Sequence, residues 1–504
     1  MASISKAISP ARVSTIVGYE LKRGRVPFAS PYLPQRIVVI GEGLTANQST
    51  MPLDETEILT AFEAGELYGF GSPLHKVFNI MKPNGIDLLQ GIPTFVIAQE
   101  EAATGVAASV VNSVTGTASG NATHFVYIAG REYAYNVLIG ETAIQIASKI
   151  ADSVNADSNS PVTAVASSGV ITFTAKWAGL TGTFKVRFST GGNSVGIVYA
   201  EDSATAGVGT PDLTTLQNKM GSEWTTIVVN TYGIPALDVL ETINGRPDAT
   251  FPTGNFFGEN FRPFIAIWGS TEKDTSILGD ITDARKIEVT NALAAAPGSE
   301  GFAWEAAANM AINFGYIAQN TPHKDPINTY YNDMPGPADG DIGNMKEYTY
   351  RDFLVKKGAS TVDYEGGRYK VKDFITTYHP DSEPWPTFRW ASRLNLDFNV
   401  RYYVMIAEQA YLVGRAIIND DQISSVDFTI KPKDWKAILY GVAEDLGDLA
   451  IVDGVEFMKE SINVEVDGQN SDRFNTIFSY KTSGNARISS ITATVYRQSV
   501  SSNA

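Results

Sequence analysis

The sequence predicts an α+β multidomain protein, with a split α/β core domain, an inserted mostly-β domain, a C-terminal α/β domain and extended terminal arms. Three observations predict this organisation. The chain has 504 residues, enough for roughly two to four ordinary domains. Buried-strand and helix patterns occur on both sides of a segment rich in Ser, Thr, Gly and Ala. Polar, β-branched residues without a helical stripe begin the chain, and a strand pattern ends it.

The core domain is predicted from buried strands and helices that flank the Ser/Thr-rich segment. We expect strands at RIVVIGEG, TFVIAQE, WTTIVVNTYG and FRPFIAIWGS. DETEILTAFEAGELYG (54–69) predicts a helix capped by Asp54, with Glu57 three residues on. PALDVLETING, DITDARKIEVTNALAA and GFAWEAAANMAINFGYIAQN also read as helices.

The inserted and C-terminal domains have different patterns. The insertion holds six short alternating strands, from HFVYIAG to GIVYAED, and one helix at 141–156. The C-terminal domain begins with the hairpin STVDYEGGRYKVKDFITTYH and continues with helices at 390–415 and 432–448. The expected segments are an N-terminal arm at 1–30, the first core part at 31–101, the insertion at 102–210, the second core part at 211–358, the C-terminal domain at 359–486 and a C-terminal arm strand at 487–504.

The last predicted strand lies in NARISSITATVYRQSV, close to the end of the chain. Ile491, Ala493 and Val495 are expected to point to one face, and Thr492, Thr494 and Tyr496 to the other. Such a strand either completes a sheet of its own chain or is offered to another molecule.

Composition narrows the functional class. The net charge of −16 argues against nucleic acid or an anionic membrane as the main partner, because both attract clustered Lys and Arg. The absence of Cys excludes disulfides and thiolate metal sites. No secretion signal is expected at the N-terminus, and no apolar run is long enough to predict a membrane span.

Three short patterns suggest enzyme or metal chemistry, and each lacks the expected context. Gly41, Gly43 and Ala46 match a dinucleotide fingerprint, but the polar run NQSTMPLDE delays the helix that the fingerprint requires. GNSVG (192–196) matches a nucleophile elbow, but a strand follows it instead of a helix. Asp339 and Asp341 suggest a calcium loop without its later acidic ligands.

Metal and cofactor sites are therefore not expected. The four His residues are far apart in the sequence, and no P-loop motif is present. Two enzyme classes remain as alternatives: a secreted carbohydrate-active enzyme using one pair of the 55 carboxylates, and a Rossmann-type oxidoreductase dependent on Gly41 and Gly43.

The insertion holds, in this order, YIAGREY, a helix ending in SVNADS, and PVTAVASSGVITFTAKWAGLTG. These motifs and the order of the parts resemble the contractile tail sheath proteins of Mu-like myophages over roughly residues 95–500. PDLTTLQNKMGSEWTTIVVNTYG resembles the point where the sheath core resumes, and STVDYEGGRYKVKDFITTYH resembles the hairpin of the C-terminal domain. LNLDFNVRYY and the closing INVEVDGQNSDRFNTIFSYKTSGNARISSITATVYRQ also fit, whereas residues 1–50 match no pattern of the family.

The resemblance implies a structural protein without cofactors that forms six-fold rings, stacked helically around a tail tube. Implied partners are other copies of the chain, the tail tube protein, and baseplate and tail terminator proteins, in a virion tail assembled in the host cytoplasm. A sheath of a bacterial contractile injection system or pyocin-like particle is the nearest alternative. The arms are expected to add strands to neighbouring subunits, with hinges at 18–35 and 479–487. The expected strand residues are Ile4, Ile8, Val13 and Val17 in the N-terminal arm, and Ile488, Ile491, Ala493, Val495 and Tyr496 in the C-terminal arm.

Overall fold

A six-stranded sheet forms the middle of the molecule in the computed structural model, which describes residues 31–247, 254–258 and 261–495. The strand order is β13-β12-β11-β1-β3-β2, and all pairs are parallel except β2 with β3. Ile37 of β1 pairs with Thr94 of β3 on one side and with Ile227 of β11 on the other. The strands are β1 (Ile37–Glu42), β2 (Thr56–Glu57), β3 (Thr94–Gln99), β11 (Ile227–Asn230), β12 (Ile265–Ser270) and β13 (Asn291–Ala295).

Helices cover both faces of this sheet. Ile37 and Val39 of β1 share a core with α2 and α7, whereas Val38 and Ile40 on the opposite face pack in the cluster of α5. β1 is buried on both faces, which explains its continuous apolar run. The helices around the sheet are α1 (Ala61–Tyr68), α2 (Pro73–Met81), α4 (Leu216–Lys219), α5 (Ile234–Asn244), α6 (Thr275–Asp283), α7 (Ala303–Asn320) and α8 (Tyr348–Lys356). Short 3-10 turns lie at Thr45–Asn47, Pro83–Gly85, Leu180–Gly182 and Gly343–Lys346.

Two of the predicted core helices are wrong in part. Residues 56–57 pair with β3, and α1 begins only after Thr60, whose hydroxyl accepts from Glu63 N at 3.1 Å. The Glu63 carboxylate in turn accepts from Leu59 N at 2.8 Å, so this pair supplies the cap that was expected from Asp54. In the predicted helix DITDARKIEVTNALAA, the observed helix ends at Asp283. The last part of this stretch is the fully buried strand β13, whose apolar run fits a strand as well as a helix.

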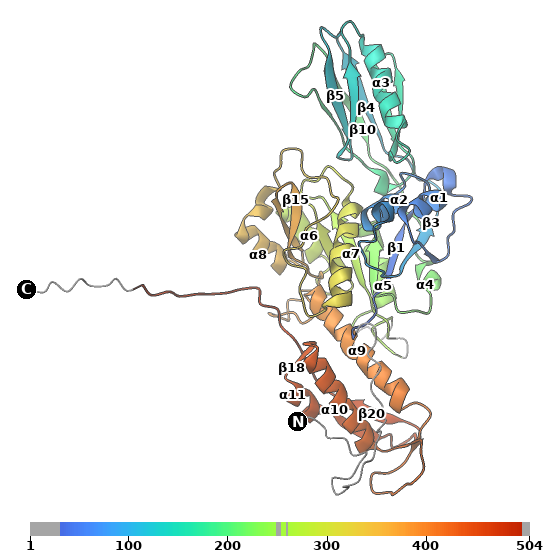
Figure 1. The fold of residues 1–504 in the computed structure, drawn as a ribbon, viewed down its shortest axis with the longest axis vertical. Coiled ribbons are helices and arrows are strands. Elements are labelled where there is room, and N and C mark those ends of the chain that lie inside the picture. Colours follow the sequence, from blue (N-terminus) through green and yellow to red (C-terminus); the bar gives the residue numbers. More distant parts are fainter. Residues whose placement is uncertain (1–30, 248–253, 259–260, 496–504) are drawn as a thin grey trace, which may run out of the picture.

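The insertion leaves the sheet after β3 and returns before β11, so the core sheet is built from both sides of it. It contains the sheets β10-β4-β8-β7 and β6-β5-β9, with α3 (Ala143–Asn155) packed against them at the end of the molecule opposite the C-terminal helices (Figure 1). All six expected strands are present, and β4 is an additional one. The strands are β4 (Ser109–Thr115), β5 (Ala122–Ile128), β6 (Arg131–Val137), β7 (Val162–Ser167), β8 (Val170–Ala175), β9 (Val186–Ser189) and β10 (Val198–Thr205).

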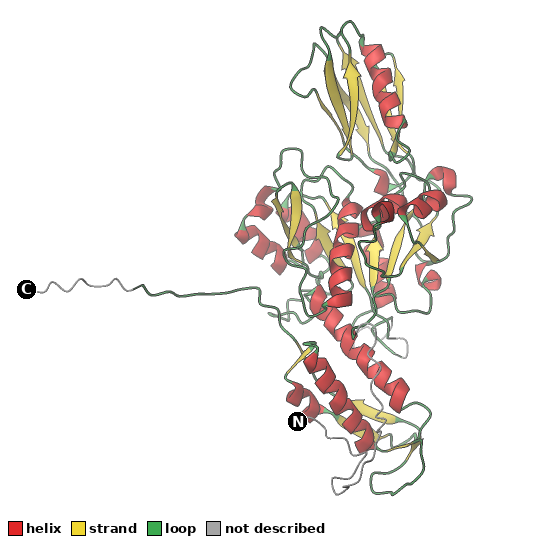
Figure 2. Cartoon of the chain, in the orientation of Figure 1, coloured by secondary structure: helices red, strands yellow, loops and turns green. Residues whose placement is uncertain are grey.

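The C-terminal part is dominated by helices, as Figure 2 shows. Helix α9 joins it to the core: Leu394 and Phe398 pack in the core cluster, whereas Val400 and Val404 pack against α10 in a separate one. Its helices are α9 (Ala391–Tyr411), α10 (Pro432–Asp448) and α11 (Val455–Ser461). Two-stranded pairs are β14 (Thr361–Glu365) with β15 (Arg368–Asp373), β16 (Ala416–Ile417) with β17 (Thr429–Ile430), β18 (Val452–Asp453) with β21 (Lys481–Thr482), and β19 (Asn463–Val466) with β20 (Phe474–Ile477).

The architecture is thus mixed α/β with several sheets, as the sequence predicts. The domain boundaries inferred from composition stay predictions. Among the described helices, none combines the length and apolar character that a membrane crossing requires.

Candidate assembly surface

The C-terminal segment leaves the body of the molecule as a single extended trace (Figure 1). From Gly484 to Val495 it forms no strand with the described part of its own chain. Ile488, Ile491 and Val495 are 87%, 86% and 85% exposed. An extended segment that keeps large apolar side chains in water lacks a partner surface among the described residues of the subunit. We name residues 488–504 the C-terminal arm, of which the structure describes 488–495; Ala493 is exposed like the other described arm residues, and Tyr496 lies outside the described residues.

The arm begins at a fixed point on the subunit. Ser483 N donates to Ile451 O at 3.0 Å, and Asn485 Nδ2 donates to His323 O at 2.8 Å. Arg487 then forms an ion pair with Asp325. We name residues 483–487 the arm root. These contacts hold the arm root against the body of the subunit. The segment without such contacts begins after Arg487, at the end of the expected hinge at 479–487.

The first described residues of the chain are held by hydrogen bonds to α9. The Tyr403 hydroxyl donates to Pro31 O, and Leu33 N donates to Asn399 Oδ1 at 2.8 Å. The expected N-terminal strand residues Ile4, Ile8, Val13 and Val17 precede this point and lie outside the described residues. One helix therefore anchors the described beginning of the chain and lies next to the root of its C-terminal arm.

Two glycines of the dinucleotide-like pattern are explained by packing. A Cβ atom on Gly41 would lie 2.9 Å from Leu74 Cδ2, and one on Gly43 would lie 2.8 Å from Met51 Sδ. Residues after Gly43 form a 3-10 turn instead of the long helix that would hold a pyrophosphate. The glycines allow close contact inside the core, and the fingerprint is accidental.

The other short patterns also have structural roles. Ser194 and Val195 lie in the turn between β9 and β10, so GNSVG forms no nucleophile elbow. Asp339 and Asp341 both lie within salt-bridge distance of Lys273, at 3.5 and 2.9 Å. In the described residues, no group of three or more His, Cys, Asp or Glu side chains is placed to hold a metal.

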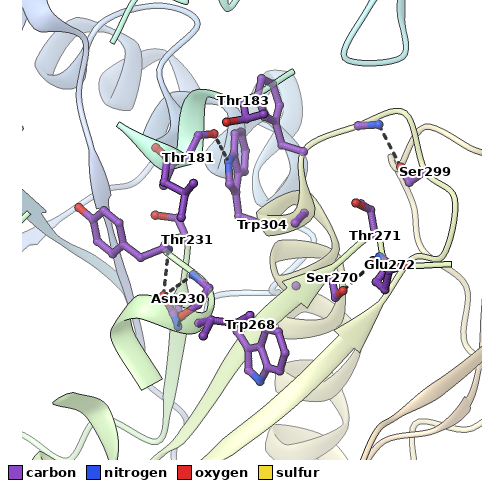
Figure 3. Close-up of a pocket in the computed structure, with 18 of the residues that line it drawn as sticks. Thr181, Thr183, Asn230, Thr231, Trp268, Ser270, Thr271, Glu272, Ser299 and Trp304 are labelled. Carbon is purple, nitrogen blue, oxygen red and sulfur yellow. Dashed lines mark hydrogen bonds between the residues drawn. The ribbon is translucent and has the colours of Figure 1, made fainter. Parts of the chain in front are cut away.

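A cavity of about 420 Å³ lies at the carboxyl ends of β11 and β12, where α/β folds often bind ligands. Figure 3 shows Thr181 and Thr183 of the insertion facing Asn230, Thr231 and the start of α7 across it. The indole Nε1 of Trp304 donates to Thr181 O at 3.2 Å. Residues 180–185 of the insertion thus form one wall of the cavity, which makes it part of the joint between insertion and core.

Charged pairs strengthen this joint. Arg187 donates to both carboxylate oxygens of Glu300, at 2.7 and 3.0 Å. Arg131 pairs with Glu305, which is 1% exposed, at 3.2 Å. Bidentate and buried pairs fix geometry better than single exposed ones. The insertion is therefore joined firmly to the core.

Buried Glu42 adds a titratable group at the same joint. The Thr181 hydroxyl donates to Glu42 Oε2 at 2.6 Å, while the other carboxylate oxygen has no partner among the described residues. Burial raises the pKa of Glu42 to about 8, and the hydrogen bond from Thr181 opposes this shift. The carboxyl group is therefore largely protonated near neutral pH.

No protein-family model matches the chain. A curated protein of Haemophilus influenzae, the Mu-like prophage FluMu tail sheath protein, is 23% identical over 456 residues, which cover 89% of this chain and 90% of that protein. This chain is a relative of the Mu-like tail sheath proteins. The resemblance found in the sequence is confirmed, and with it the expectation of a structural sheath protein rather than an enzyme.

The chain also aligns with a solved sheath tail protein of Desulfitobacterium hafniense. The alignment covers 94% of this chain and 100% of that protein. The sequences are 11% identical and the TM-score is 0.41.

The inter-subunit strand that the sequence predicts at residues 487–504 stays a prediction, and no pattern in the sequence predicted the contacts of the arm root. Arg487 and Asp325 are 162 positions apart, so no local pattern connects them. The one available signal is an arginine next to an apolar strand pattern in an acidic chain.

Proposed function

We propose that this chain is the structural subunit of a contractile tail sheath, polymerising in six-fold rings around the tail tube and contracting to drive the tube through the host envelope during genome delivery. The observation that carries the proposal is similarity to a tail sheath protein along 89% of the chain. Residues 488–495 of the C-terminal arm support it, because they are largely exposed and pair with no described strand. A free strand is a connector in a polymer and a liability in a monomer.

The arms join neighbouring subunits by β-augmentation, in which main-chain hydrogen bonds add a strand to an existing sheet. The C-terminal arm supplies Ile488, Ile491, Ala493, Val495 and Tyr496, and the N-terminal arm supplies Ile4, Ile8, Val13 and Val17. Four two-stranded pairs occur in the described chain beyond the core sheet and the insertion. Such pairs gain stability from a third strand.

Contraction is driven by surface that becomes buried between subunits. At about 25 cal/mol per Å² of apolar area, a few hundred Å² per subunit contributes several kcal/mol. Desolvation and ordering reduce this value. Because every subunit contributes, the sum over a long sheath is large, and no nucleotide is required.

The partners are other copies of this chain, the tail tube protein, and baseplate and tail terminator proteins, within a virion tail assembled in the host cytoplasm. The core and C-terminal domain face the tube, and the insertion points outward. Support comes from the position of the insertion at the end of the molecule opposite the C-terminal helices (Figure 1). A bacterial contractile injection particle would use the same subunit geometry, but the similar curated protein is named as a prophage protein.

Negative-stain electron microscopy of the purified chain, concentrated and in salt, tests the proposal. Hollow striated tubes with a wide bore are the expected result. If only single particles form, purified tail tube is added to nucleate assembly. Single particles in the presence of the tube would contradict the proposed function.

A further inference from the structure

Two arginines at the beginning of α9 have no carboxylate partner in the described part of the chain. Arg389 immediately precedes Trp390, the N-cap residue, and Arg393 lies in the first turn. The Nε atom of each is buried and makes no hydrogen bond with a described residue. Burial lowers the pKa of Arg389, because no acidic group offsets the desolvation of its charge.

The arm root brings a third arginine to the same place. Arg487 lies over the ring of Trp390, and the Cβ position of Gly484 is 3.9 Å from Arg393 Nη2. Arg487 uses Nη2 for Asp325, whereas its Nε and Nη1 are buried and make no hydrogen bond within the described part of the chain. The described contacts of these three arginines therefore include one carboxylate, that of Asp325.

The helix end increases the excess of positive charge. No side chain caps α9 at Trp390, and no acidic residue lies in its first turn. The N-terminus of a helix carries a partial positive charge, which repels arginine and attracts an anion. Ser392 Oγ and Asn395 Nδ2 of the same helix are also buried, in residues that are each 2% exposed, and make no hydrogen bond with a described residue. Buried donors without a partner are rare in folded proteins, so the Nε atoms of Arg389 and Arg393 call for a missing acceptor.

We propose that a carboxylate of a second copy of this chain binds Arg389 and Arg393 beside the arm root when subunits assemble. The inference rests on the proposed self-assembly. With 55 acidic and 39 basic residues, a neighbouring copy is a ready source of carboxylates. A planar guanidinium binds a carboxylate through two parallel hydrogen bonds, which fixes its direction. The contact fixes the neighbour where the C-terminal arm leaves the subunit.

The test is the double substitution Arg389→Gln with Arg393→Gln in the full chain. In dilute solution, the melting temperature of the variant is expected to rise by about 2 °C or more, because two half-buried charges without a described carboxylate partner are removed. Assembly, measured by sedimentation and electron microscopy, is expected to fall at least about tenfold. The control replaces Arg473 and Lys356 with Gln; these side chains are 65% and 70% exposed, so both readouts should stay near wild type.

Two results would overturn the inference. A melting temperature that falls by several degrees would mean that the arginines have partners within the subunit. Unchanged self-assembly would mean that no neighbouring copy binds Arg389 and Arg393. The same conclusion would hold if the variant assembled normally and lost only the binding of added tail tube.

A wild-type chain that never assembles contradicts the proposed function, and a separate measurement then tests the arginines. Glutarate serves as a free dicarboxylate probe. It should raise the melting temperature of the wild type and not that of the double variant, by mass action on the folded state. Equal responses of the two chains would overturn the site.

Discussion

The guanidinium of Arg487 lies over the indole ring of Trp390, with 3.1 Å between Cζ and the ring centroid. The same guanidinium pairs with Asp325, so one side chain joins the arm root both to the start of α9 and to the loop after α7. Cation–π contacts and charged pairs gain strength when water is excluded, and the Arg487 side chain is only 12% exposed. This residue therefore defines where the body ends and the arm begins.

Asp325→Asn should detach the arm root. Removing one partner of a buried ion pair costs about 3–5 kcal/mol, because the other charge is left uncompensated. Residues 481–487 should then open more often, and trypsin should cleave after Lys481 at least about tenfold faster. Asp381→Asn is the control. Asp381 pairs with Lys286, but its side chain is 82% exposed, so losing this pair should cost little. Equal cleavage rates in both variants would refute an anchoring role for Arg487.

Deleting residues 488–504 should separate folding from assembly. The described arm residues Ile488, Ile491 and Val495 are largely exposed, so their loss removes little buried surface. The melting temperature should change by less than about 1 °C. Tube formation should be lost, because the connecting strand is missing. A truncated chain that still forms long tubes would disprove the role of the arm.

The sequence predicted those parts of the fold whose patterns are local. The apolar run of β1 predicts a buried strand, and the long apolar stretch of α7 predicts a helix. At the predicted hairpin turn, Gly366 and Gly367 both have positive φ, 58° and 79°. The prediction was wrong at β13, where the same apolar run fits a strand or a helix. It was also wrong at the start of α1, where Thr60 is the N-cap instead of the expected Asp54.

The remaining features depend on contacts between distant parts of the chain. Glu42 and Thr181 are 139 positions apart, and Arg187 and Glu300 are 113 apart. Each residue alone is an ordinary polar side chain in the sequence. Their pairing follows from the way the insertion packs on the core, which no periodicity encodes.

Gly130→Ala should weaken the joint between insertion and core. Gly130 has a φ of 71°, and its Cβ would lie 2.4 Å from Pro335 Cβ. Gly140→Ala is a matched control, because its φ is 82° but no atom lies within 4 Å of its Cβ position. Both variants bear the cost of a left-handed alanine, about 1 kcal/mol. Gly130→Ala should cost about 1–3 kcal/mol more by overpacking, as measured by urea unfolding. Equal losses would show that the contact with Pro335 adjusts freely.

Glu42→Gln should change how stability depends on pH. Burial raises the folded-state pKa from 4.5 to about 8, so the charged form is disfavoured in the folded chain. The contribution of this group to stability is complete below about pH 4.5 and is lost progressively as the pH rises to about 8. At 1.36 kcal/mol per pKa unit, the total is on the order of 4–5 kcal/mol, as an upper limit.

A Gln side chain stays neutral at every pH and keeps an oxygen that can accept from the Thr181 hydroxyl. The variant should therefore be close to wild type near pH 5 and more stable than wild type near pH 8, by urea unfolding. Because other buried carboxyl groups titrate equally in both chains, the difference between the two chains isolates Glu42. Glu456→Gln controls for general charge effects, since Glu456 is 79% exposed. A difference that stays constant between these pH values would mean that the pKa of Glu42 is not raised in the folded chain.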